Sequence, residues 1–214
     1  MPKKAFSHVT TWVFDLDNTL YPPQARLFDQ IEVRITTFVM QALNVDRPTA
    51  NMLRQKYWRE YGTTLTGLMR EHNVDPEPYL VDVHDISLDA LKPDPLLATQ
   101  IRALPGRRIV YTNGTAPYAK RVLAARGLNG LFDAVYGVEH AKFLPKPERA
   151  AFETIFHLDG VITQSAAMFE DEPRNLQAPH EMGMRTVHVA AEPYAADHIH
   201  HHTDDLLNFL NLLT

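Results

Sequence analysis

Five short apolar segments recur along the chain, and each is followed by polar residues or by a helical pattern. They lie at residues 9–15, 108–112, 133–137, 166–170 and 185–189. Apolar runs of this length, bounded by turn residues, predict buried strands. Apolar residues at helical spacing follow the last four segments and predict helices at 115–126, 147–158, 173–182 and 204–213. Strands that alternate with helices predict an α/β fold with a parallel sheet covered on both faces.

Residues 21–95 break this alternation. Their pattern predicts helices at 24–43, 49–61, 65–71 and 78–84 and no strand, and Pro93 and Pro95 mark the far edge. We therefore expect a Rossmann-like core formed by residues 1–20 and 96–214, interrupted by a helical cap at 21–95. Because the insert follows the first strand directly, it would overhang the carboxyl end of that strand. Pro179 lies inside the predicted helix 173–182 and should kink or shorten it.

Composition narrows the classes of partner and chemistry. The 214 residues carry a formal net charge of −5, which argues against binding of a nucleic acid polymer. There is no cysteine, so disulfides, thiolate catalysis and cysteine-based metal sites are excluded. The apolar stretch behind Lys3 and Lys4 is too short and polar for a signal peptide, and no run reaches the ~18 apolar residues of a membrane span. These features predict a soluble cytoplasmic protein without a membrane partner, and they leave its oligomeric state open.

Asp15 and Asp17 lie two residues apart at the end of the first predicted strand. Asp17 and Asn18 are also common turn residues, which is the simpler interpretation of this pair. The chemical interpretation is that one carboxylate attacks phosphorus and forms an aspartyl-phosphate. The other can donate a proton to the leaving oxygen and then activate water. Ligands of open α/β sheets bind outside the carboxyl ends of the strands, where this pair is expected.

Two later segments could bind the phosphate. Thr112, Asn113 and Gly114 end the second strand and precede a helix, so the threonine hydroxyl and the free backbone N–H groups could cradle an anion. The same residues could simply cap the helix. Lys146 stands between two prolines, which restrict the backbone and suggest a held side chain. A lysine there could neutralise both the aspartate and the phosphoryl oxygens.

A third acidic segment ends the fourth strand. Glu170, Asp171 and Glu172 come just before Pro173. Carboxylates at this point can hold Mg²⁺, or they can act as acids at a helix N-terminus, which is the role we expect for Glu172.

A histidine cluster stands near the C-terminus, at His198, His200, His201 and His202. Imidazoles can bind zinc or nickel, but adjacent histidines on a surface segment are more often solvated, and we assign these no role.

The order of these motifs resembles the haloacid dehalogenase superfamily over nearly the whole chain. The resemblance implies that Asp15 is the nucleophile and Asp17 the general acid and base. It implies that Thr112 and Lys146 bind the phosphoryl group. Mg²⁺ would be held by Asp15, Asp171 and the backbone carbonyl of Asp17. It further implies supporting roles for two residues of the acidic segment, Glu170 and, through a bond across the loop, Asn175.

Two features narrow the resemblance. The dehalogenase branch lacks an acid at the position of Asp17, so this residue favours phosphoryl transfer. The segment 15–21, Asp-Leu-Asp-Asn-Thr-Leu-Tyr, together with segments 61–68 and 83–85, is similar to the pyrimidine 5′-nucleotidase branch. This implies a magnesium-dependent phosphatase for small phosphate monoesters, with a pyrimidine nucleoside 5′-monophosphate as the expected substrate. The cap would choose the leaving group, with residues 62–64 near the mouth of the site. A phosphomutase acting on a sugar phosphate and a non-catalytic phosphate-binding regulatory module are the alternatives.

Overall fold

The sheet of the protein is parallel and six-stranded, with the strand order β3-β2-β1-β4-β5-β6. The computed structural model describes residues 2–214. The strands are β1 (Thr11–Phe14), β2 (Arg107–Tyr111), β3 (Ala134–Tyr136), β4 (Ala166–Glu170), β5 (Arg185–Val189) and β6 (His201–Thr203). The predicted α/β class with a parallel sheet is confirmed, and β4 and β5 have the bounds that the sequence predicts.

The central strand β1 is buried over its whole length, as a strand covered on both faces must be. Its side chains alternate between the two faces of the sheet. Trp12 and Phe14 belong to one apolar cluster and Val13 to another. Asp15 follows directly, where the chain leaves the sheet.

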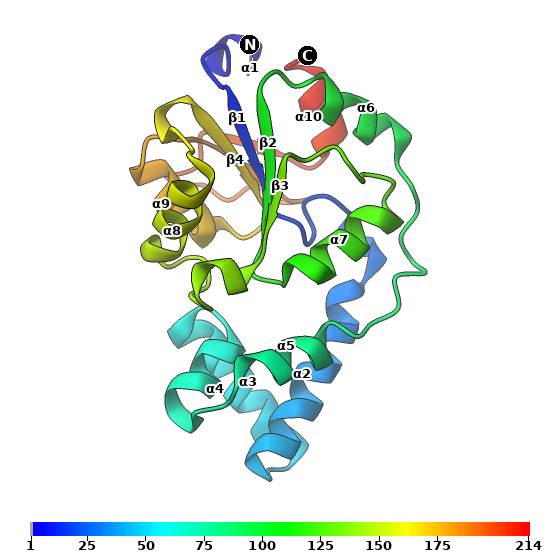
Figure 1. The fold of residues 1–214 in the computed structure, drawn as a ribbon, viewed down its shortest axis with the longest axis vertical. Helices are drawn as coiled ribbons and strands as arrows, with labels where there is room; N and C mark the ends of the chain where they lie inside the picture. The colour runs from blue at the N-terminus through cyan, green and yellow to red at the C-terminus, as the bar shows by residue number, and fades with distance from the viewer. Residues whose placement is uncertain (1) are drawn as a thin grey trace.

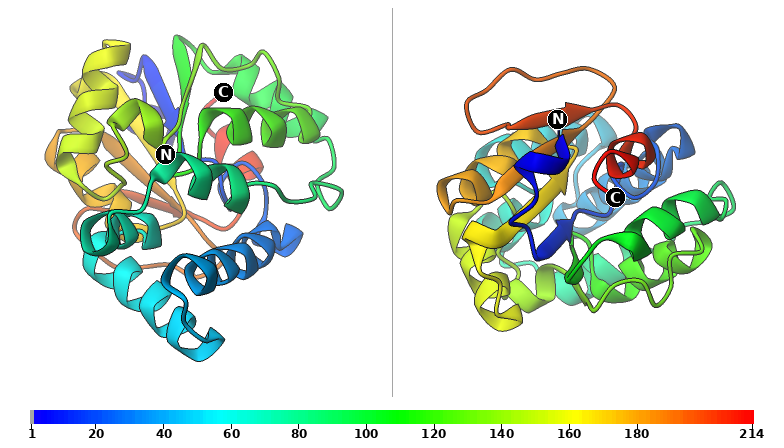
Figure 2. Two further views of the ribbon diagram at one scale, coloured as in Figure 1. Left: turned by 60° about the horizontal axis from the view of Figure 1, so that its bottom comes forward. Right: turned by 90° about the horizontal axis from the view of Figure 1, so that it is seen from above.

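Helices cover both faces of the sheet (Figures 1 and 2). On one face lie α6 (Pro95–Ala103), α7 (Ala116–Ala125) and α10 (Leu206–Asn211), which share an apolar cluster with Trp12 and Phe14. On the other face lie α8 (Arg149–Asp159) and α9 (Gln177–Glu181), which pack around Val13. The short helix α1 (Pro2–Ala5) precedes β1. None of the helices in the described part of the chain has both the length and the apolar character that crossing a membrane requires.

Four helices follow β1 and lie at one end of the sheet, opposite the chain termini (Figure 1). They are α2 (Leu27–Leu43), α3 (Arg47–Tyr61), α4 (Thr64–His72) and α5 (Pro76–Val83), hereafter the cap helices. They enclose an apolar cluster of their own, which the core residue Val138 joins. Asp46 and Thr63 cap α3 and α4 by accepting the backbone N–H groups of Thr49 and Thr66. The division of the chain into a core and a cap at residues 20/21 and 95/96 stays a prediction.

Besides the short helix α1, a strand and a helix of the fold escape the sequence pattern. Strand β6 contains His201 and His202, which pair with β5 at the edge of the sheet and are half-buried. His202 Nε2 lies 2.8 Å from the backbone oxygen of Ala190, and His198 Nε2 lies 3.0 Å from that of Pro173. The expectation of a solvated segment is therefore wrong for these histidines, because backbone pairing and hydrogen bonds order them. Helix α6 is the other element, and it begins at Pro95, the proline that marks the far edge of the predicted helical insert.

The predicted helix 173–182 is divided into two short elements. A 3₁₀ turn covers Pro173–Leu176, and α9 begins only at Gln177. Pro179 therefore lies in the first turn of α9, where its missing N–H costs no hydrogen bond. The expected shortening at this proline is confirmed.

Candidate active site

The candidate site lies where the strand order reverses, between β1 and β4. The chain adds β2 and β3 on one side of β1 and β5 and β6 on the other side of β4, which leaves a crevice at the carboxyl ends of the central pair. Asp15 follows β1 in this crevice, and its backbone N–H donates a 2.9 Å hydrogen bond to the carbonyl of Phe169. Glu170 is the last residue of β4 and Asp171 the next. Acidic groups of distant segments thus meet at one point.

Lys146 forms the buried ionic centre of this crevice. Its side chain is only 1% exposed, and Nζ lies 2.6 Å from Asp15 Oδ1 and 2.6 Å from Glu170 Oε2. A third bond, of 3.2 Å, goes to the backbone oxygen of Tyr111, so all three ammonium donors are used. Burial alone would lower the pKa of Lys146, but the two carboxylates outweigh it and raise that pKa above its ordinary value. The lysine is therefore cationic.

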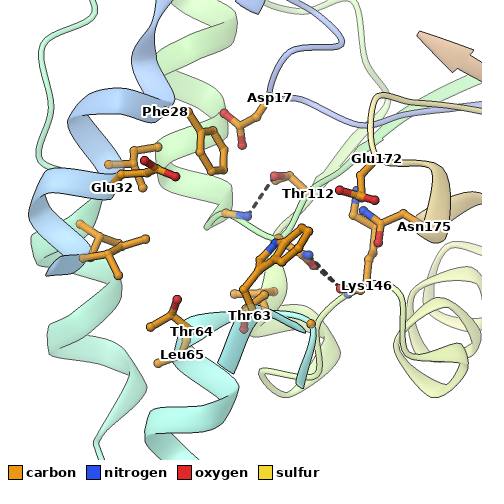
Figure 3. A pocket seen from close by; sticks show the side chains of 18 of the residues that line it. Asp17, Phe28, Glu32, Thr63, Thr64, Leu65, Thr112, Lys146, Glu172 and Asn175 are labelled. Atoms are coloured by element: carbon orange, nitrogen blue, oxygen red, sulfur yellow. Dashed lines mark hydrogen bonds between the residues drawn. The ribbon is translucent and has the colours of Figure 1, made fainter. Parts of the chain in front are cut away.

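The loop after β2 brings the remaining phosphate-binding candidates to the same place. Thr112 is buried, and its Oγ1 accepts a 2.9 Å hydrogen bond from the backbone N–H of Gly114 (Figure 3). The hydroxyl proton of Thr112 is thereby left to point at another acceptor. Asn113 uses its side chain differently from the expectation, because its amide holds the backbone of Lys146 through bonds of 3.0 and 2.8 Å.

Three carboxylates, two of which bind the lysine, form a candidate metal site. Oxygens of Asp15, Glu170 and Asp171 all lie within 4.8 Å of one another. Burial and then the Glu170 charge raise the pKa of Asp15 to about 8, against the lowering by Lys146. Burial, Glu170 and Asp15 raise the pKa of Asp171 to about 9. This surplus of negative charge, carried by hard oxygen donors, matches what Mg²⁺ requires. The structure thus brings Glu170 and Asp171 of the acidic segment together with Asp15, while the Asp17 side chain lies outside this cluster.

Asp17 has a different environment from Asp15. Its Oδ1 accepts hydrogen bonds from the hydroxyls of Tyr21, at 2.6 Å, and Tyr118, at 2.9 Å. Burial raises the pKa of Asp17, and these two bonds oppose the rise without cancelling it. The motifs assign no role to either tyrosine. Tyr21 is the last residue of the segment 15–21 that resembles the nucleotidase branch, whereas Tyr118 occupies an ordinary apolar position of its predicted helix.

The loop after β4 differs from expectation at one asparagine. Asn175 is buried, and its side-chain oxygen has no hydrogen-bond partner among the described residues. The bond across the loop comes from Asn18 instead, whose Nδ2 donates to Asp171 Oδ2 at 3.1 Å. Glu172 lies at the start of the 3₁₀ turn, as expected, but its side chain makes no capping bond there.

A cavity of about 660 Å³ joins these groups to the cap helices. Asp15, Asp17, Thr112, Lys146 and Asp171 line its core side. Residues of all four cap helices line the rest, and Thr63, Thr64 and Leu65 lie on the cap side of the cavity, at the start of α4 (Figure 3). The predicted position of residues 62–64 at the site thus agrees with the structure.

Comparison with solved structures supports the fold. A HAD phosphatase from Thermococcus onnurineus superposes with a TM-score of 0.63 at 16% identity, covering 96% of this chain and 98% of that one. A 2-haloacid dehalogenase from Pseudomonas syringae pv. Tomato DC3000 gives 0.59 at 17% identity, with the same coverage of both chains. At such identities the likeness shows the architecture alone.

Comparison of sequences goes further. Phosphate metabolism protein 8 of Saccharomyces cerevisiae is 27% identical over 197 residues, which are 85% of this chain and 61% of that protein. The chain thus spans about three-fifths of the length of that relative. The family model for a haloacid dehalogenase-like hydrolase matches residues 9–183, which include every motif of the site. The chain therefore belongs to the haloacid dehalogenase-like hydrolase family.

Proposed function

We propose that this hydrolase is a magnesium-dependent phosphatase that forms an aspartyl-phosphate on Asp15. The observation that carries the proposal is the contrast between two carboxylates that line one cavity. Asp15 is paired with Lys146, whereas Asp17 accepts two tyrosine hydroxyls. Two carboxyl groups with such different hydrogen-bond partners are suited to different tasks, here Asp15 as nucleophile and Asp17 as proton carrier.

In the first step, a carboxylate oxygen of Asp15 forms a bond to the substrate phosphorus while the bond from phosphorus to the ester oxygen breaks. Asp17 transfers a proton to the departing oxygen, for which its raised pKa is suited. Lys146 balances the charge of Asp15, and the Thr112 hydroxyl would donate to a phosphoryl oxygen. The backbone N–H groups of Thr112 and Gly114 have other partners, the oxygen of Tyr136 and the Thr112 hydroxyl oxygen.

In the second step, Asp17, now a carboxylate, accepts a proton from a water molecule that attacks phosphorus. The bond between phosphorus and Asp15 breaks, inorganic phosphate leaves, and the Asp15 carboxylate is restored. The two tyrosines that bind Asp17 keep it in one orientation through both steps.

The acidic cluster fits the magnesium ion that this chemistry needs. Asp15, Asp171 and the backbone carbonyl of Asp17 would hold it, with Glu170 close by. When bound, Mg²⁺ cancels the repulsion between the nucleophile and the phosphate and stabilises the charge of the transition state. The crowding that raises the pKa of Asp15 and Asp171 is the observation that supports a cation at this point.

Two further arguments bear on the reaction and substrate. The fold is shared with dehalogenases as well as phosphatases, and the acid Asp17 beside Asp15 favours phosphoryl transfer. A pyrimidine nucleoside 5′-monophosphate is the substrate we propose, since the motif from Asp15 to Tyr21 resembles the nucleotidase branch. The name of the yeast relative, Phosphate metabolism protein 8, agrees with phosphate chemistry.

Phosphate release from a panel of esters tests this proposal. The panel contains UMP, CMP, AMP, pyridoxal phosphate and sugar phosphates, with a 2-haloacid as the competing substrate class. We expect magnesium-dependent release of phosphate, fastest from UMP or CMP, and no halide release. Halide release without phosphatase activity would overturn the proposal.

A further inference from the structure

The cavity is much larger than a phosphate group requires. Its volume of about 660 Å³ lies within the range of sites that enclose whole metabolites or cofactors. The core residues occupy one end, where the phosphoryl group would bind. The cap helices therefore wall off the space that the rest of the substrate would fill.

Two aromatic side chains in this space are unusually exposed. Phe28 of α2 is 44% exposed and Trp58 of α3 is 46% exposed, and both line the cavity. Phe28 points into the cavity from the cap side, towards the region of Asp17 (Figure 3). Large apolar faces are normally removed from water, so an exposed pair inside a cavity indicates a ligand that covers them.

Trp58 is held in place from the core. The guanidinium carbon of Arg174 lies 3.8 Å from the centre of its ring. The same guanidinium donates to the backbone oxygens of Trp58, at 3.1 Å, and Gly62, at 3.2 Å. These carbonyl groups lie at the C-terminal end of α3, where the helix dipole favours a cation. The indole is thus oriented before any ligand binds, which lowers the entropy cost of binding.

A polar pair lines the same part of the cavity. Glu32 Oε1 lies 2.7 Å from Arg54 Nη1, and both residues line the cavity beside the aromatic side chains. The carboxylate is half exposed, and it points inwards from α2 (Figure 3). Together the pair offers a hydrogen-bond acceptor and hydrogen-bond donors that could bind the edge of a planar ring. A plain sugar phosphate has no such ring.

We propose that Phe28 and Trp58 bind the nucleobase of a nucleoside monophosphate, with Arg174 as the residue that positions Trp58. Glu32 and Arg54 contact the edge of the base. The inference rests on the proposed function for the phosphate end of the substrate, and it goes further by assigning the residues that select the leaving group.

Fluorescence tests base binding without any turnover. The chain has two tryptophans, and Trp12 is buried at 2% exposure, so Trp58 is the one a ligand in the cavity can quench. In an Asp15→Asn background, uridine and UMP should quench the emission saturably, and ribose 5-phosphate should not. A Trp58→Leu variant should lose the response. No quenching by UMP, or equal quenching by ribose 5-phosphate, would overturn the base site.

Kinetics provides the second arm. Trp58→Leu should lower kcat/KM for UMP by about tenfold or more, as expected for a lost base stack, and leave that for ribose 5-phosphate within about twofold. Arg174→Lys should likewise lower kcat/KM for UMP more than kcat/KM for ribose 5-phosphate. Met52→Ala is the matched control, because Met52 is 57% exposed on α3 and does not line the cavity. Equal losses on both substrates would overturn the inference. A wild-type protein that quenches with UMP but hydrolyses no ester would refute the phosphatase proposal alone.

Discussion

The Asn113 side chain and the Lys146 backbone hold each other through two reciprocal hydrogen bonds. Asn113 Nδ2 donates to the Lys146 oxygen at 3.0 Å, and the Lys146 N–H donates to Asn113 Oδ1 at 2.8 Å. The pair joins the loop after β2 to the loop that carries the lysine. Because the backbone is fixed there, Nζ reaches Asp15 and Glu170 at 2.6 Å each.

Replacing this asparagine should therefore damage catalysis more than folding. We expect Asn113→Ala to lower kcat by roughly ten- to hundredfold, since a small displacement of a catalytic group has effects of that size. Steady-state kinetics with UMP measures the change, and thermal unfolding checks the fold. Asn129→Ala, at an exposed position, is the control and should be neutral. A wild-type kcat in Asn113→Ala would show that the lysine is positioned by other contacts.

Metal binding should be visible in stability as well as in activity. In EDTA, activity should be lost and the unfolding midpoint should fall as the pH rises from about 5 to 9. The carboxyl groups of Asp15 and Asp171, with pKa values raised to about 8 and about 9, keep protons that the unfolded chain has already released. The folded state then binds more protons than the unfolded state, so stability declines with pH.

Adding Mg²⁺ should restore activity and raise the midpoint, most at the higher pH, because the ion binds the ionised carboxylates. Differential scanning fluorimetry across this pH range measures the effect. Asp171→Asn should abolish the gain, whereas Asp204→Asn, at an exposed position, should keep it. A midpoint that does not respond to Mg²⁺ at any pH would contradict the metal site.

The tyrosine hydroxyls on Asp17 should matter according to the leaving group. Tyr118→Phe removes the 2.9 Å bond to Asp17 Oδ1 but keeps the buried ring. We expect kcat for UMP to fall by about tenfold, because its alkoxide needs a proton from a well-placed acid. Hydrolysis of para-nitrophenyl phosphate should fall much less, because its leaving group departs without protonation. Tyr136→Phe, which loses a bond to Asp159, is the control. Equal losses on both esters would refute this role.

Arg126 should be important for stability. This buried residue bonds to the backbone oxygen of Leu20, at 3.2 Å, and to Asp94 Oδ2, at 2.9 Å, so it ties together the segments that enter and leave the cap helices. We expect Arg126→Met to lower the free energy of unfolding by about 2–3 kcal/mol, from the lost bonds and the unpaired partners. Urea denaturation measures it, with the exposed Arg102→Met as the control. A loss under about 0.5 kcal/mol, the usual range for surface changes, would contradict this view.

Much of the fold could be predicted because its strands are apolar runs and its helices are periodic. Strand β6 could not, since its histidines form no apolar run and only pairing with β5 orders them. Helix α6 was hidden by prolines that we interpreted as a boundary, although Asp94 caps it.

The site shows a similar division. The order of the motifs led to Asp15, Lys146 and Asp171, which the structure brings together. The bond from Tyr118 to Asp17 spans 101 residues of sequence, and no local pattern announces it. The family resemblance also implied a bond across the loop from Asn175, which Asn18 makes instead.

The most direct test of the account is to trap the covalent intermediate. Acid quenching of the enzyme during turnover of UMP, followed by peptide mass spectrometry, should find one phosphoryl group on the peptide that contains Asp15. The Asp15→Asn protein, once circular dichroism has shown that it is folded, should carry no phosphoryl group. Its turnover rate should be lower by at least about a thousandfold. A phosphoryl group on another residue, or full activity in Asp15→Asn, would contradict the central claim.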